Sequence, residues 1–493
     1  MRPAMPPSLL HATLFVSGAV VMVLELLGTR LLAPLYGTGL PVWSAQITVT
    51  LAALAVGYWS GGALADRRPS AGPFLAILVL AALATLLVRP LATPVLQATS
   101  GLGLRAGVLV AAALLFGPAL ALLGMLGPFA CRLHPAHAAA TGRAVGRLYA
   151  VSTAGSVAGA LLAGNVLAPA LPLGRIFQLA ALALAAMAVV GAVVTRRRRA
   201  AAGALAVLAT AALPAGHPAL PRGVRLVRDD QSFFQRVQTI DADGQRWLLL
   251  DGLVHTHVLL EGDDPVRCEY ARAAELVPAV RAGARRFLAI GCGGGAMIRL
   301  LQGGDRTFDV VELDEAVVRA AREDFGAAVP GAVFHAGDGR AFLRGGGTWD
   351  AALVDVVSTE TMPEHLSSSA FFGELKRALR PGGVALFNSI GAPGGAALAS
   401  FGRTLAAAFG RVRGFTAHLE EGATNVVWLA TDGPLELPEA LREAYEPRAY
   451  DPGPGGIVLT DDHNPVNAWN AELGLAFRRR LHDWLGPGLA AAR

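Results

Sequence analysis

The sequence predicts an α-helical transmembrane bundle followed by an α/β domain built on a largely parallel sheet. Of the 493 residues, 53% are apolar and only 16% are charged, which is too apolar for an ordinary soluble protein. Charged residues are sparse before about residue 195 and frequent after about residue 220, so the chain divides into two unlike parts. We therefore predict a transmembrane domain at 1–217 and an α/β region after it.

Seven apolar segments lie within the first part of the chain. They fall near 9–28, 42–64, 74–96, 106–130, 148–171, 174–195 and 200–216. The first six are about 20 residues or longer, enough for a helix to cross about 30 Å of hydrocarbon, whereas the seventh is short. The sequence thus predicts six to seven spans. Small residues at 57–66 and 152–164 predict that some of these helices approach closely.

Arginines mark the loops that follow the second, fourth and sixth segments. They are Arg67 and Arg68, then Arg132, Arg143 and Arg147, then the run 196–199. Because basic loops beside spans face the cytoplasm, these loops and the N-terminus are expected inside the cell. A full seventh crossing would put the α/β part outside. We instead expect the seventh segment to be interfacial or re-entrant, or one earlier span to be misassigned, with the α/β part in the cytoplasm.

The formal charge of +5 does not indicate nucleic-acid binding. Much of the excess lies in the short arginine loops, and no basic stripe is interleaved with aromatic residues. The three cysteines, Cys131, Cys268 and Cys292, lack the spacing of a zinc site or a disulfide framework. We expect neither a nucleic-acid partner nor a metal.

The stretch 285–314 is the centre of the α/β part. A short apolar run at 287–290 passes into GCGGG at 291–295, a helix-forming run follows, and a second strand at 308–313 contains Glu312 and is followed by Asp314. Strand, glycine turn, helix and strand with a terminal acid form the opening unit of a Rossmann-like sheet, whose acid binds a ribose. Ala296 replaces the last glycine of the dinucleotide pattern. The stretch therefore predicts a nucleoside, and dinucleotides and S-adenosylmethionine both remain open.

Two further acids follow predicted strands. Asp338 lies in HAGDGRAFL (335–343), and Asp355 ends the strand in WDAALVDVV (349–357). Ligands of open α/β sheets bind beyond the carboxyl ends of the strands, so Asp355 is expected to face the reactive group of the ligand. A carboxylate at position 338 accepts N–H groups, whereas a phosphate would require donors.

Two segments of the first part carry a resemblance to a known family. ELLGTRLLAPLYGTGLPVWS (25–44) and GYWSGGALADRRP (57–69) closely resemble the membrane part of the multi-span spermidine-synthase-like proteins of bacteria. Those proteins join a hydrophobic half to a domain related to polyamine aminopropyltransferases. The resemblance implies a multi-pass protein of the bacterial inner membrane. It also implies a small β-sheet and helix at 218–280, ahead of a Rossmann-like, methyltransferase-like domain at 281–493.

The motifs that match the family also imply site residues. The resemblance assigns cofactor binding to Gln235, Gly291, Gly293, Gly295, Glu312 (ribose), Asp338 (adenine) and Gly339. It assigns substrate binding to Asp251, His255, Tyr270, Ser358, Asp461 and Asp462, and catalysis to Asp355. For two of these assignments a structural alternative stays open. Asp251 and Gly252 also fit a plain hairpin turn, and either Asp461 or Asp462 also fits a helix cap.

Several substrate motifs depart from the family pattern. Ser358 replaces a second acid, His255 replaces a glutamine, and Ala271 replaces a histidine after Tyr270. Gly294 stands where the family has an acid that faces the amine of decarboxylated S-adenosylmethionine. Losing this acid and gaining space suit a ligand that keeps its own carboxylate, because neighbouring carboxylates repel. Intact S-adenosylmethionine is therefore expected in preference to its decarboxylated form.

Three classes of function remain. The first is transfer of the aminopropyl-type arm of the cofactor to an amine, or to the cofactor's own amine or carboxylate with no second substrate, releasing 5′-methylthioadenosine. The second is methyl transfer, and the third is a transporter or sensor whose nucleoside domain binds without chemistry. The resemblance of the hairpin and of Asp355 favours the first. The expected partners are the lipid bilayer and a small acceptor or none, and a homo-oligomer is left open.

Overall fold

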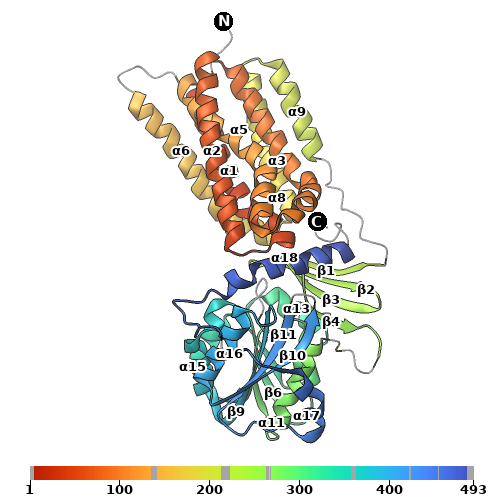
Figure 1. Cartoon of the computed structure of the whole chain (residues 1–493). Helices are drawn as coiled ribbons and strands as arrows, with labels where there is room; N and C mark the ends of the chain where they lie inside the picture. Colours follow the sequence, from red (N-terminus) through yellow and green to blue (C-terminus); the bar gives the residue numbers. More distant parts are fainter. Residues whose placement is uncertain are drawn as a thin grey trace. The chain divides into compact units, whose positions relative to one another are not determined.

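The chain forms two compact units (Figure 1). The structure, a computed structural model, describes residues 5–134, 141–212, 223–262, 266, 268–356, 362–420, 423–453 and 455–485. The first unit takes in Met1–Leu220 and the second Pro221–Trp484, so the division lies close to the domain boundary predicted after residue 217.

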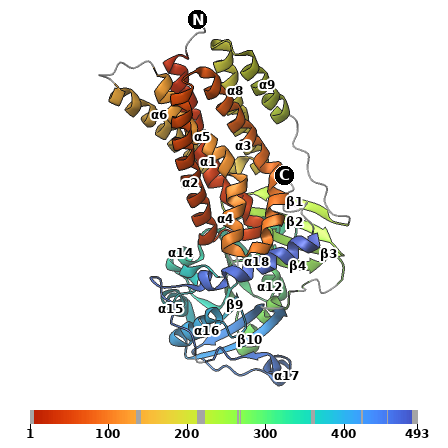
Figure 2. The ribbon, with the colours of Figure 1, turned by 45° about the horizontal axis from the view of Figure 1, so that its top comes forward.

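The first unit is helical throughout its described part, and its long helices run alongside one another in two views (Figures 1 and 2). Its α-helices are α1 (Pro7–Tyr36), α2 (Leu40–Arg67), α3 (Ala71–Thr99), α4 (Leu104–Leu115), α5 (Gly117–Leu133), α6 (Thr141–Leu162), α7 (Ala168–Ala170), α8 (Leu173–Val194) and α9 (Arg198–Ala212).

Within the described residues, five helices are long and apolar enough to cross a membrane. The bent pair of α4 and α5, whose axes differ by 53°, raises the number to six if it counts as one span. These helices coincide with the first six predicted apolar segments. The seventh segment forms α9, which has 15 residues and is not among the candidate spans.

Glycines set how closely two pairs of these helices pack. A Cβ added at Gly155 of α6 would lie 2.0 Å from the carbonyl oxygen of Phe15 in α1, and one at Gly57 of α2 would lie 2.2 Å from the carbonyl oxygen of Ala121 in α5. Real Cβ atoms never approach so closely, so only glycine permits these contacts. The close approach predicted from 57–66 and 152–164 is confirmed, and it makes α1 with α6 and α2 with α5 two tight pairs.

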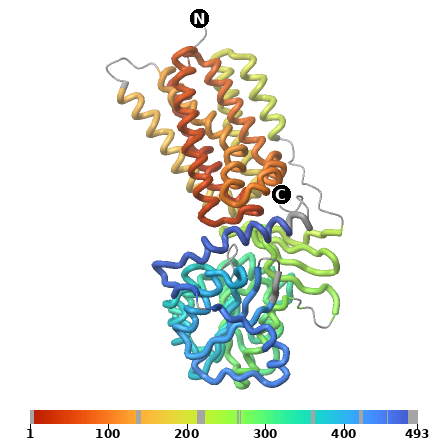
Figure 3. Tube along the Cα trace, viewed as in Figure 1, coloured from red at the N-terminus to blue at the C-terminus, as the bar shows by residue number. Residues whose placement is uncertain are grey.

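The second unit begins with a small antiparallel sheet, whose strands follow one another as hairpins along the chain (Figure 3). The strands are β1 (Arg225–Gln231), β2 (Arg236–Ala242), β3 (Gln245–Leu250) and β4 (Leu253–Leu259). The β2–β3 and β3–β4 turns each consist of an Asp-Gly pair with positive φ at both residues, 51° and 72° at Asp243 and Gly244, and 46° and 76° at Asp251 and Gly252. Such turns match the twist of the strands and fix their register.

The large sheet has eight strands in the order β12-β10-β11-β9-β8-β5-β6-β7. The five strands from β9 to β7 in this order pair in parallel. The strands are β5 (Arg286–Ile290), β6 (Thr307–Glu312), β7 (Ala332–Ala336), β8 (Trp349–Val354), β9 (Leu379–Gly391), β10 (Arg411–Glu420), β11 (Ala423–Thr431) and β12 (Ala449–Tyr450). The helices are α10 (Glu269–Arg272), α11 (Leu276–Val280), α12 (Ala296–Leu300), α13 (Glu315–Glu323), α14 (Gly339–Arg344), α15 (Ser369–Ala378), α16 (Ala396–Ala408), α17 (Glu439–Tyr445) and α18 (Val466–Leu485).

The strand order places a topological switch point between β5 and β8. From β5 the chain moves outward to β6 and β7 and then crosses back to β8 on the other side. Both faces of β5 are buried, since Phe287 and Ala289 belong to one apolar core and Leu288 and Ile290 to the other. This explains its unbroken apolar run. Ligands of doubly wound sheets bind at such a switch, beyond the strand ends.

The glycine contacts in the helical unit lead to a prediction about stability. Gly155→Ala should destabilise the protein by about 1–3 kcal/mol, because the new methyl group must push α1 and α6 apart. A Cβ at Gly146 of the same helix would meet nothing within 4 Å. Gly146→Ala should therefore be neutral or stabilising by up to about 1 kcal/mol, since alanine favours the helix. Thermal unfolding of the purified protein measures both, and equal effects of the two substitutions would contradict the packing.

Candidate active site

The glycine turn after β5 has a backbone conformation that other residues rarely adopt. Gly291, Gly293 and Gly295 have φ of 77°, 47° and 72°, all in the left-handed region. A Cβ on Gly291 would lie 2.3 Å from the carbonyl oxygen of Asp355. The turn is therefore packed directly against the residue that follows β8.

Glu312 ends β6 beside this turn. One of its carboxylate oxygens accepts a hydrogen bond from the backbone N–H of Cys292 (3.0 Å), and the other accepts one from the N–H of Asp314 (3.2 Å). Burial raises the pKa of Glu312 above its ordinary value, although these N–H bonds oppose the shift. The predicted pairing of glycine turn and terminal acid is thus present in space.

Asp338 lies just beyond the neighbouring strand β7. It caps α14, its Oδ1 accepting the N–H of Ala341 at 2.7 Å, and His365 Nε2 lies 3.0 Å from its Oδ2. Partial burial opposes ionisation, but these two hydrogen bonds outweigh it and lower the pKa of Asp338. Gly339 follows, and a Cβ there would lie 2.3 Å from Ile290 Cγ2, so α14 packs closely on β5.

Asp355 is the acid nearest the switch point. Its N–H donates to the carbonyl of Ile290 at 3.0 Å, and Asn388 Nδ2 donates to its Oδ1 at 2.9 Å. Burial raises the pKa of Asp355 to about 6, while hydrogen bonds from Asn388 and Tyr270 lower it in part. A carboxylate with this pKa accepts a proton readily near neutral pH.

A cavity beside Asp355 gathers residues from both sheets. Tyr270, Thr256, Gly291 and Cys292 line it together with Asp355, and its volume is about 10 Å³, the room that one water molecule needs. Glu312 and Asp338 do not line it. Glu312 reaches the same turn through the N–H of Cys292.

The predicted space over Gly294 is absent. The N–H of Gly294 donates to Thr256 Oγ1 at 2.9 Å, and a Cβ there would lie 2.7 Å from Thr256 Cγ2 and 3.1 Å from Phe325. The glycine is therefore explained by packing against β4. The prediction that Gly294 leaves extra space for a ligand carboxylate was wrong. The missing negative charge at this position is the remaining reason to expect such a ligand.

The predicted residues of the small sheet have local roles in the structure. Asp251 occupies the β3–β4 turn, and its Oδ1 accepts the N–H of Arg236, the first residue of β2, at 2.9 Å. His255 is neutral at pH 7, because burial, aided by the positive charge of Arg478, lowers its pKa to about 4. Tyr270 donates to the carbonyl oxygen of His255 at 2.8 Å.

The loop that carries Gln235 is tied to the turn after β6. Gln235 is half-buried, and its backbone N–H donates to Ser232 Oγ at 2.9 Å. Ser232 in turn donates to Asp314 Oδ2 at 2.6 Å. Between Glu312 and Asp314, Leu313 is 47% exposed, an apolar surface that no sequence motif singles out.

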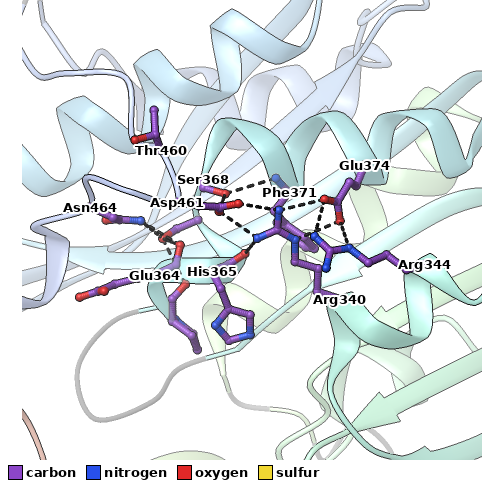
Figure 4. Close-up of polar contacts among 12 residues, drawn as sticks. Arg340, Arg344, Glu364, His365, Ser368, Phe371, Glu374, Thr460, Asp461 and Asn464 are labelled. Carbon is purple, nitrogen blue, oxygen red and sulfur yellow. Dashed lines mark hydrogen bonds and ion pairs between the residues drawn. The ribbon is translucent and has the colours of Figure 1, made fainter.

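Asp461 has a different place from the one predicted. Figure 4 shows Arg340 between Asp461 and Glu374, with 2.9 Å contacts to each, and Ser368 donating to Asp461. The carboxylate is paired with Arg340 and does not cap α18, which begins at Val466. Asp462 is exposed, and Ser358 lies outside the described residues. Within the described part of the chain, no group of three or more His, Cys, Asp or Glu side chains is arranged to hold a metal ion.

The Arg340 network was missed because its members are far apart in sequence. Arg340 follows Asp338 by two residues, whereas Asp461 lies 121 residues beyond Arg340. The network joins α14, α15 and the segment before α18, so it holds the start of α14 in place. The family motif around Asp461 was the only available signal, and it did not indicate a partner.

Comparison with known proteins agrees with this architecture. Residues 287–383 match the family model described as "Methyltransferase domain". This part of the second unit is therefore methyltransferase-like. The chain also shares 34% identity over 147 residues with spermidine synthase 1 of Hyoscyamus niger, covering 28% of this chain and 45% of that one. Spermidine synthase 2 of Arabidopsis thaliana shares 33% over 147 residues, covering 28% and 42%. Part of the chain is thus homologous to spermidine synthases, and it spans less than half the length of these relatives.

Solved structures give weaker likenesses. A probable spermidine synthase from Corynebacterium glutamicum has 19% identity and a TM-score of 0.37, covering 42% of this chain and 80% of its own. The spermidine synthase of Thermotoga maritima has 18% identity and a TM-score of 0.36, covering 53% and 88%. Human methyltransferase-like protein 13, in complex with SAH, has 18% identity and a TM-score of 0.30, covering 43% and 93%.

The network around Arg340 predicts a difference between two arginines that share Glu374. The Arg340 side chain is 7% exposed and that of Arg344 is 61% exposed. Arg340→Met should cost about 2–3 kcal/mol, less than a fully buried pair, because Asp461 is partly hydrated. Arg344→Met should cost much less, because its ion pair with Glu374 is exposed and screened by solvent. Denaturant unfolding measures both, and equal losses would contradict a structural role specific to Arg340.

Proposed function

We propose that the second unit is an S-adenosylmethionine-dependent transferase that acts on the carbon chain next to the sulfonium and releases 5′-methylthioadenosine. The observation that carries the proposal is Asp355, a half-buried acid at the switch point of a methyltransferase-like domain, whose pKa is raised to about 6 by desolvation. Homology to spermidine synthases favours transfer of the propyl-type arm over transfer of the methyl group.

The acids of the site fit an adenosine sulfonium better than a phosphate cofactor. Glu312 and Asp338 follow adjacent parallel strands, in which Glu312 pairs with Ala336. Carboxylates accept hydrogen bonds from ribose hydroxyls and from an adenine amino group, and they attract a positive sulfur. A pyrophosphate at the same edge would face like charges. When bound, the sulfonium supplies an activated carbon–sulfur bond.

The chain's own contribution is orientation and one proton transfer. Asp355 would accept a proton from the attacking amine as its nitrogen bonds to the carbon and the carbon–sulfur electron pair leaves with sulfur. If the cofactor's own carboxylate attacks instead, no proton has to be removed. The negative charge of Asp355 would then balance the positive charge of the sulfonium. The hydrogen bond from Asn388 holds the Asp355 carboxylate in place.

One feature favours intact S-adenosylmethionine reacting with its own amine or carboxylate. Gly294 leaves the turn without an acid, so a ligand carboxylate meets less repulsion there. Methyl transfer is the second candidate, supported by the match to the methyltransferase family.

Product analysis with purified full-length protein tests the proposal. With S-adenosylmethionine alone, 5′-methylthioadenosine is expected. Its appearance only with decarboxylated cofactor and putrescine would indicate polyamine synthesis, and S-adenosylhomocysteine would indicate methyl transfer. Unchanged cofactor in every condition would leave binding without chemistry and overturn the proposal.

The pKa of Asp355 sets an expected pH dependence. If Asp355 acts as a base, turnover should fall as the pH drops through about 6, because protonation removes the acceptor. Asp355→Asn should lose at least about 100-fold in kcat while still binding cofactor. Asp305→Asn, at an exposed ion pair, is the matched control with unchanged activity. Full activity of Asp355→Asn would remove it from catalysis.

We also propose that the first unit spans the plasma membrane of a bacterium and that the second unit is cytoplasmic. Six spans return the chain to the side of its N-terminus, and α9, at 15 residues or about 22 Å, is too short to add a seventh. The arginine loops favour the cytoplasm for that side. A C-terminal fluorescent protein should therefore fluoresce and a C-terminal alkaline phosphatase should stay inactive; an active phosphatase would reverse the orientation.

A further inference from the structure

The helical unit contains a cavity of about 150 Å³ that the transferase proposal does not use. Residues of four helices line it, α1, α2, α5 and α6. These helices form the two glycine-packed pairs, α1 with α6 and α2 with α5, so the cavity lies where one tight pair meets the other. Each pair is fixed internally by contacts that admit no Cβ. The cavity is therefore bounded by two rigid walls.

Its lining is polar but uncharged. Tyr58 of α2 and Tyr149, Ser152 and Thr153 of α6 contribute hydroxyl groups. The other lining residues are aliphatic side chains, glycines, Cys131 and two serines. Two more lining hydroxyls, those of Ser17 and Ser156, already donate to backbone carbonyls at 3.0 and 3.2 Å. Among the residues that the structure describes, none that lines the cavity is Asp, Glu, Lys, Arg or His.

This chemistry selects the kind of molecule that fits. A charged ligand would lose its hydration with no opposite charge to replace it. A purely apolar ligand would leave the hydroxyl groups without hydrogen bonds in an apolar surrounding, which is also costly. An uncharged molecule with an apolar body and a hydrogen-bonding group satisfies both parts of the lining.

The volume limits the size of such a molecule. An engineered protein cavity of similar volume accommodates benzene, so about six to ten non-hydrogen atoms fit. A nucleoside is too large. We propose that this cavity is a binding site for a small uncharged amphiphile, a compact ring or short chain carrying a hydroxyl or carbonyl group.

Cys131 provides a reporter, because it lines the cavity. The rate at which a small maleimide alkylates Cys131 in the purified full-length protein is followed by peptide mass spectrometry, with benzyl alcohol as the probe. At about four times its Kd, benzyl alcohol should slow alkylation about fivefold, because only unoccupied protein reacts. Toluene, which lacks the hydroxyl, and benzoate, which is charged, should protect much less.

A cavity-filling variant separates binding from general effects of the alcohol on the detergent. Gly127 lines the cavity, and a Cβ there would meet nothing within 4 Å. Gly127→Leu should fold, occupy the space and abolish protection by benzyl alcohol. Gly146→Leu, on the exposed side of α6 and outside the cavity lining, is the matched control and should retain protection.

The hydroxyl groups are tested by combining Tyr58→Phe, Tyr149→Phe, Ser152→Ala and Thr153→Val. This variant should bind toluene and benzyl alcohol equally well. The proposal is overturned if benzyl alcohol gives no protection, if protection persists in Gly127→Leu, or if toluene or benzoate protects the original protein as well as the alcohol does. None of these outcomes depends on transferase activity.

Discussion

The contact between Gly291 and the carbonyl of Asp355 is the constraint on which the site depends. It exists because β5 and β8 are adjacent parallel strands and because no side chain intervenes at position 291. The contact brings the acid close under the glycine turn, where it is half-buried. Burial then raises the pKa of Asp355 to about 6, so a packing constraint on the backbone becomes a chemical property of the carboxylate.

Glycine performs the same physical task in both units. In the helical unit it lets Gly155 and Gly57 contact the backbones of neighbouring helices, and in the α/β unit it lets the turn contact Asp355. The results differ because the surroundings differ. Between helices, the close approach of the backbones creates two rigid pairs, and a space lined by hydroxyl groups lies where the pairs meet. At the sheet, the close approach of the glycine turn leaves a small cavity beside Asp355.

The parts of the fold that could be predicted from the sequence have local causes. The apolar run of β5 and the acids after β6 and β8 are adjacent in sequence to the strands that place them, so Glu312 and Asp355 could be placed at strand ends. The Asp-Gly pair at 251 and 252 likewise specifies its own turn. Six apolar segments were long enough to be recognised as helices without any tertiary information.

What could not be predicted depends on residues brought together by the fold. Arg340 meets Asp461 only after 121 residues of intervening chain, and Asn388 reaches Asp355 from another strand. The space expected over Gly294 is filled by Thr256, which comes from a separate sheet. The glycine at position 294 shows that a negative charge of the family motif is missing. Whether it also leaves room depends on which residue from elsewhere in the chain packs against it.

The most direct test is an experimental structure of the protein with 5′-methylthioadenosine bound. The ribose hydroxyls should contact Glu312, the adenine amino group should contact Asp338, and the sulfur should point toward Asp355. A ligand bound with its sulfur directed away from Asp355, or bound outside the edge formed by these three acids, would contradict the account.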